Sequence, residues 1–99
     1  MGHPIILSSL AQLEIQEAYS WYEGKQNGLG ERFIAIIEEA INIISTTPES
    51  FPIKIKQFRQ YPILKFPYII IYEFIPKEDL IYILHIFNTH QDPDKKLLL

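Results

Sequence analysis

The residues of this sequence that could take part in chemistry are a small group of cationic side chains and one histidine. They are Lys54, Lys56, Arg59, Lys65 and His90. Cations stabilise the charge that a phosphate gains in a transfer reaction, and a histidine exchanges protons near neutral pH. The hydroxyl of Tyr61 could donate a further proton. These residue types are compatible with chemistry on a phosphodiester, although their spacing matches no specific catalytic motif.

Each of these side chains also has a structural interpretation. Lys54 and Lys56 alternate with isoleucines, as side chains do on a strand with one solvated face. Arg59 and Lys65 flank a predicted strand, where they could bind an acidic partner or only improve solubility. His90 stands in a polar group at a strand end, a position typical of a residue that caps a turn. The sequence leaves both interpretations open.

Other kinds of site have no support in the sequence. It has no cysteine, and we find no metal-ligand spacing, no glycine-rich phosphate loop and no nucleophile paired with a histidine. We therefore expect neither a metal nor a cofactor. The formal net charge of −3 argues against a general affinity for nucleic acid, which depends on neutralised phosphates. No apolar run approaches the roughly 18 residues of a membrane-spanning helix, and no signal peptide is visible, so we expect a cytoplasmic protein with no membrane partner.

The elements that must position these residues are organised around two long apolar runs, Tyr68–Ile75 and Leu80–Phe87. Runs rich in Ile, Tyr and Phe predict buried strands, and the short polar break between them suits a hairpin. Alternation places two sets of side chains on opposite faces: Tyr68, Ile70, Tyr72 and Phe74 on one, Ile69, Ile71 and Glu73 on the other. His85 is expected to be a hydrogen-bonded core or half-buried residue, on the face of Ile81, Ile83 and Phe87.

Two helices are predicted before these strands. A short strand over Pro4–Leu7 leads to Ser8 or Ser9, either of which could cap a helix that begins near Leu10 and ends at Gly24. The second helix has a regular polar stripe from Glu31 to Thr46, and Thr47-Pro48 ends it. We expect the two helices to form an antiparallel hairpin, with Trp21 and Tyr22 as core aromatics.

Two further strands are predicted over Ile53–Gln57 and Phe58–Leu64. The whole chain, residues 1–99, is then a single α+β domain: an N-terminal strand, an antiparallel helical hairpin, and a three- to four-stranded antiparallel sheet with the hairpin on one face. The terminal Leu97-Leu98-Leu99 is expected to dock on the body of the protein or on a partner.

This order of elements, together with three stretches of sequence, resembles the RelE/ParE superfamily of toxins from type II toxin–antitoxin modules. The stretches are AYSWYE at 18–23, GERFIAIIEEAINIISTTPESFP at 30–52, and FRQYPILKFPYIIIYEF at 58–74, followed later by Asp92-Pro93. Together they span nearly the whole chain. The resemblance implies the toxin fold, an activity that inhibits growth, and a cognate antitoxin that neutralises it.

Within this superfamily the sequence is nearer the ParE-like members, which the resemblance associates with inhibition of DNA gyrase through protein binding. RelE-like members cut messenger RNA on the ribosome, and two arginines of their pattern are replaced here by Ile69 and Gln91. The alternative function is therefore an endoribonuclease with a reduced site at His90, Arg59 and Lys65. A third alternative is a binding module on the same fold that is not toxic.

The resemblance also has implications for partners. Lys54, Lys56, Arg59 and Lys65 are candidates for binding the antitoxin or the target, and an acidic amphipathic antitoxin segment would match Arg59 and Lys65. The target would be DNA gyrase or, under the alternative, the translating ribosome. A homodimer and a toxin–antitoxin hetero-oligomer are both compatible with the sequence. One of the two aromatics at 21 and 22 could instead form the floor of the antitoxin groove.

Overall fold

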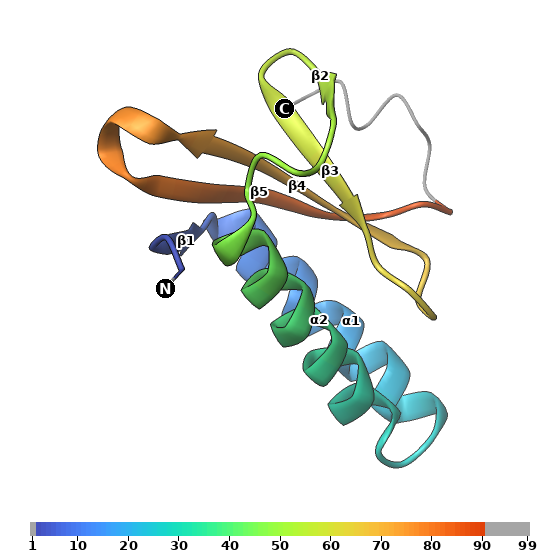
Figure 1. The fold of residues 1–99 in the computed structure, drawn as a ribbon. Helices are drawn as coiled ribbons and strands as arrows, with labels where there is room; N and C mark the ends of the chain where they lie inside the picture. Colours follow the sequence, from blue (N-terminus) through green and yellow to red (C-terminus); the bar gives the residue numbers. More distant parts are fainter. Residues whose placement is uncertain (1, 91–99) are drawn as a thin grey trace.

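The computed structural model describes residues 2–90. Gln91, Asp92-Pro93 and Leu97-Leu98-Leu99, on which some predictions depend, lie outside the described residues. Two helices lie on one side of a five-stranded sheet with the strand order β1-β5-β4-β3-β2 (Figure 1). The elements are β1 (Ile5–Leu7), α1 (Ser9–Lys25), α2 (Leu29–Thr46), β2 (Ile53–Ile55), β3 (Phe58–Pro62), β4 (Tyr68–Ile75), the 3-10 turn η1 (Pro76–Glu78) and β5 (Leu80–Asn88).

The α+β class, the leading strand and the helical hairpin are confirmed. The sheet is larger than the antiparallel part alone, because β1 pairs with β5 in parallel while the other neighbouring strands are antiparallel. The predicted strands over 53–57 and 58–64 are both shorter in the structure. Lys56 adopts the left-handed conformation, with φ of 52°, so it belongs to the turn between β2 and β3.

The β4–β5 hairpin is the centre of the sheet, and it contains a β-bulge. Ile71 pairs with His85 whereas Tyr72 pairs with Ile83, so Leu84 is an extra residue in β5. The bulge shifts the alternation of every later side chain. Ile86 therefore packs in the core beneath the helices with Ile81 and Ile83, while Leu84 and Phe87 pack in a second cluster.

The bulge also corrects the predicted position of His85. Its ring contacts Phe87, with the centroids 5.4 Å apart, so these two side chains share a face as expected. Ile81 and Ile83 belong to the other face. Strict alternation predicted one face for all four residues, and it was wrong because the extra residue between 83 and 85 reverses the sides.

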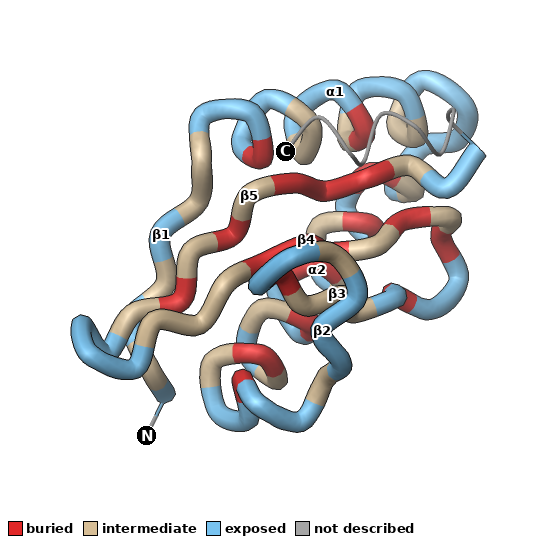
Figure 2. Tube along the Cα trace, turned by 90° about the horizontal axis from the view of Figure 1, so that it is seen from above, coloured by how far each residue is buried: buried red, intermediate tan, exposed pale blue. Residues whose placement is uncertain are grey.

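The main core lies between the helices and the sheet. Helix α2 contributes buried residues at helical spacing, and α1 contributes two alanines that allow close approach. Four aromatic rings meet at the end of the core near the helical turn, with centroids 4.8–6.3 Å apart: Tyr22, Phe33, Phe66 and Tyr68. Figure 2 shows the buried segments concentrated along β4 and β5.

The helix boundaries agree closely with the sequence. Ser8 is the N-cap of α1, its hydroxyl accepting a hydrogen bond from the Ala11 amide at 2.9 Å. Gly28, with φ of 87°, precedes α2 in the left-handed conformation that favours glycine, and Thr47 ends α2 before Pro48. Neither described helix combines the length and apolar character needed to cross a membrane.

Candidate functional site

The edge of β5 that faces α1 is only partly covered by a strand. Strand β1 pairs with residues 81–83, and beyond them the chain turns into α1. The N-terminal half of α1 supplies the next hydrogen bonds. The Ser8 hydroxyl donates to the Leu84 carbonyl at 2.6 Å, and a Glu14 carboxylate oxygen accepts from the Ile86 amide at 2.7 Å. Two side chains, one from the N-cap of α1 and one from the helix, thus take the place of a neighbouring strand.

Glu14 also contacts His85. Its second carboxylate oxygen, Oε2, lies 2.5 Å from His85 Nδ1, and the two side chains are only 17% and 9% exposed. Nδ1 has no hydrogen bond of acceptable geometry among the described residues. The contact is a salt bridge only when the imidazole carries a second proton. It ties α1 to β5 at the bulge.

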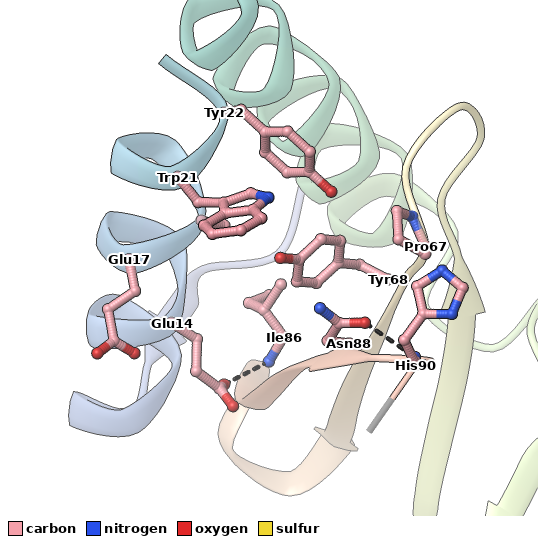
Figure 3. A pocket seen from close by; sticks show the side chains of 10 residues that line it. Glu14, Glu17, Trp21, Tyr22, Pro67, Tyr68, Ile86, Asn88 and His90 are labelled. Carbon is pink, nitrogen blue, oxygen red and sulfur yellow. Dashed lines mark hydrogen bonds between the residues drawn. The ribbon is translucent and has the colours of Figure 1, made fainter. Parts of the chain in front are cut away.

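Beyond Ile86 the space between α1 and β5 opens into a pocket of about 340 Å³. Figure 3 shows Trp21 and Tyr68 turned toward this space, and Glu17 pointing outward at its rim. The lining residues come from α1, the start of β4 and the end of β5: Glu14, Glu17, Ala18, Trp21, Tyr22, Pro67, Tyr68, Ile86, Asn88 and His90. The pocket thus brings together segments that lie far apart in the sequence.

The polar groups of the pocket are suited to binding. Burial raises the pKa of the Tyr68 hydroxyl from 10 to about 12, and the neighbouring Tyr22 adds to the effect, so this hydroxyl stays protonated at neutral pH. Asn88 Oδ1 accepts a hydrogen bond from the His90 amide at 2.8 Å. The backbone of His90 is thus held by a side chain, while its imidazole is exposed.

Trp21 is the main departure from the predicted core. It is 61% exposed, whereas Tyr22 packs in the aromatic cluster as predicted. The exposed indole is accompanied by Lys25, whose Nζ lies 4.2 Å from the ring centroid. One turn of helix separates the two residues, which is the spacing at which helical side chains meet. Trp21 therefore lines the pocket, and its expected place in the floor of an antitoxin groove stays a prediction.

Arg59, a predicted site residue, is held on the helix side of the sheet. Its Nη1 donates to the Phe51 carbonyl at 2.7 Å and to the Glu49 carbonyl at 3.4 Å. Nearby, the Tyr72 hydroxyl donates to the Pro48 carbonyl at 2.6 Å. These bonds fix the loop between α2 and β2, so in this structure the guanidinium is engaged by backbone carbonyls.

The other predicted site residues are dispersed. Lys54 and Lys56 are exposed at β2 and the turn after it, and His90 lies at the pocket beside α1. Lys65 has a left-handed backbone, with φ of 74°, and lines a second pocket of about 230 Å³ together with Ile36, Glu39, Ala40, Tyr61, Ile63 and Leu64. The three residues proposed for RNA cleavage are not gathered in one pocket. Their catalytic role stays a prediction.

Both the sequence and the fold of this chain are similar to those of known proteins. The family model described as "ParE toxin of type II toxin-antitoxin system, parDE" matches residues 5–93. The chain belongs to the ParE toxin family. A solved structure described as "Chromosomal ParDE TA system from P. aeruginosa" contains a chain of similar fold, with a TM-score of 0.64 and 12% sequence identity, covering 89% of this chain and 97% of that one. At this identity the likeness shows the fold alone. No curated protein matches the sequence significantly.

In this ParE-family chain, sequence reasoning missed Glu14, Tyr68 and Asn88 as pocket residues. A signal for Glu14 was present. It lies on the same helical stripe as Ala11 and Ala18, so it is a carboxylate placed on a face that is otherwise apolar. Such a residue needs a partner, and the edge of β5 provides it. Asn88 had no comparable signal, because its role depends on where β5 ends relative to α1.

Proposed function

We propose that this chain is the growth-inhibiting toxin of a type II toxin–antitoxin module, kept inactive in the cytoplasm by a cognate antitoxin. We further propose that it acts by binding a protein target, DNA gyrase, as expected for the ParE-like members that it resembles. Membership of the ParE family supports the toxin role and the antitoxin partner. The observation that carries the preference for protein binding is the separation of Arg59, Lys65 and His90.

Cleavage of RNA would require an acid, a base and cations within hydrogen-bond reach of one phosphodiester. Lys65 and His90 line different pockets. One nitrogen of the Arg59 guanidinium, Nη1, donates to two carbonyls of its own chain. This arrangement favours a role for Arg59 in the loop after α2, and it leaves the nuclease alternative with a site that would have to be assembled on binding.

A growth experiment tests the proposal. The chain is expressed from an inducible promoter, alone or with its antitoxin, and the 5′ ends of cellular RNA are mapped after induction. We expect growth arrest without codon-phased cleavage, reversed by the antitoxin, and inhibition of supercoiling when the purified protein is added to DNA gyrase. Because His90 is exposed, His90→Ala should leave the fold and the arrest unchanged.

Three results would lead elsewhere. Codon-phased cuts that disappear in folded His90→Ala would establish the nuclease alternative. Arrest with intact RNA and fully active gyrase would point to another protein target. No arrest in the presence of abundant folded protein would indicate a non-toxic binding module. Arg59→Ala is useful only with a measured unfolding curve, since the loss of its loop contacts is expected to lower stability.

A further inference from the structure

The pocket between α1 and β5 has the composition of a site for a cationic side chain. Among its lining residues are three aromatic rings and two carboxylates, while the only basic residue is the exposed His90. Aromatic faces attract cations through the quadrupole of the ring, most strongly for tryptophan. The carboxylate of Glu17 has no bond to any described residue and stands at the rim, where it could pair with an incoming charge (Figure 3).

Trp21 already holds a cation within the chain. The Lys25 ammonium lies 4.2 Å from the centroid of its ring, although both residues are exposed and nothing else fixes them there. This contact indicates that the ring face is accessible and attracts positive charge. A planar guanidinium would stack on the indole better than an ammonium does, and it could also donate a hydrogen bond to the Glu17 carboxylate at the rim.

The surface beside the pocket indicates what carries that cation. Leu10 and Leu13 are 47% and 49% exposed on α1. With Glu17 and Trp21 they form one ridge along the helix, at the i, i+3, i+7, i+11 spacing. An exposed apolar ridge that leads to a charged, aromatic pocket fits a peptide segment with apolar residues and one basic residue.

We propose that this pocket receives an arginine side chain of the cognate antitoxin, stacked on Trp21 and paired with Glu17, while apolar residues of the same segment cover Leu10 and Leu13. The choice of partner rests on the function proposed above; the choice of a cation rests on the charges and rings of the pocket. The acidic antitoxin segment expected at Arg59 and Lys65 would bind elsewhere, near the loop after α2 to which Arg59 Nη1 donates.

The sequence offers a direct reporter, because Trp21 is the single tryptophan. Titrating the purified antitoxin into the chain should change the intensity and wavelength of its emission. The same titration followed by calorimetry gives affinities for the variants. We expect Trp21→Ala to weaken binding at least tenfold, as at an interfacial hot spot. Glu17→Lys should weaken it about fivefold, while the matched control Glu38→Lys, on the solvent face of α2, should change it less than twofold.

Two further variants separate cation binding from simple packing. Lys25→Gln should raise the affinity, by about twofold, because it removes the intramolecular cation that competes for Trp21. In the antitoxin, each arginine is replaced in turn with methionine, and the affinity of each variant is measured for the parent chain and for Glu17→Lys. At one arginine the two losses of affinity should not add, which identifies it as the partner of Glu17. A packing role for the pocket would produce neither effect.

Several outcomes would overturn the inference. One is the absence of any complex, and another is a complex that forms without a change in Trp21 emission. A third is an equal affinity for the parent and for folded Trp21→Ala and Glu17→Lys. The fourth is a loss of affinity in Lys25→Gln. The growth experiment tests the proposed toxicity separately from the proposed pocket. A chain that binds antitoxin through this pocket but does not arrest growth would remove the proposed toxicity and leave the site. A chain that arrests growth but binds its antitoxin without using the pocket would remove the proposed site and leave the proposed toxicity.

Discussion

At the scale of single residues, two buried tyrosines place their hydroxyl groups at the border of the core, one at the loop after α2 and one at the pocket. Tyr72 is fully buried and donates to the Pro48 carbonyl, and Tyr68 is buried at the base of the pocket. Burial raises the pKa of each hydroxyl from 10 to about 12. Both hydroxyls are neutral in the folded protein at any pH below that range, and that of Tyr72 acts as a donor.

This leads to a prediction for alkaline pH. In the unfolded chain the tyrosines lose their protons near pH 10, whereas in the folded chain they keep them until about pH 12. A raised folded-state pKa favours folding below pH 10, and this contribution is lost between pH 10 and 12. The loss is roughly 2–3 kcal/mol per tyrosine at most. Urea unfolding at pH 8 to 11.5 measures it, and Tyr72→Phe should show a smaller decline. An equal decline in both proteins would contradict the assignment to Tyr72.

At the scale of elements, Ser8 joins a helix to a strand. Its hydroxyl accepts from the Ala11 amide and donates to the Leu84 carbonyl, so one side chain caps α1 and satisfies the edge of β5 at the bulge. We predict that Ser8→Ala lowers the free energy of unfolding by about 1–2 kcal/mol, since it removes a cap and leaves a part-buried carbonyl unpaired. Equilibrium denaturation measures this change. The adjacent Ser9→Ala is the control and should stay within about 0.5 kcal/mol of the parent.

The elements also show how far the sequence could predict the structure. Helix ends depend on local chemistry, so Ser8 and Thr47-Pro48 marked them correctly. Strand faces depend on pairing with another segment. The alternation in β4 was therefore right along its length, while the bulge at Leu84, which no local signal marks, reversed the later part of β5. Trp21 was misplaced for a related reason: its neighbours suggest a core position, and only the packing of α1 against β5 shows which side of the helix is covered.

At the scale of the whole molecule, β1 protects the edge of the central hairpin. It pairs with Ile81–Ile83, and the Ile81 amide donates to the Pro4 carbonyl at 2.9 Å. We predict that deleting residues 2–7 exposes this edge and produces larger assemblies, because an unpaired strand edge recruits other strands. Light scattering coupled to gel filtration measures the mass, with a chain lacking only residues 1–2 as control. Identical masses for the two proteins at matched concentrations would contradict the prediction.

The same pairing has a consequence for how the protein is made. Strand β1 leaves the ribosome well before its partner β5, and the walls of the pocket are divided in the same way, because Trp21 is synthesised well before Asn88. Folding during translation proceeds from the N-terminus, but here neither the sheet nor the pocket can be completed before β5 emerges. A chain that has not yet reached β5 therefore lacks the pocket proposed above, and a partner could recognise the protein through this pocket only after β5 has been made.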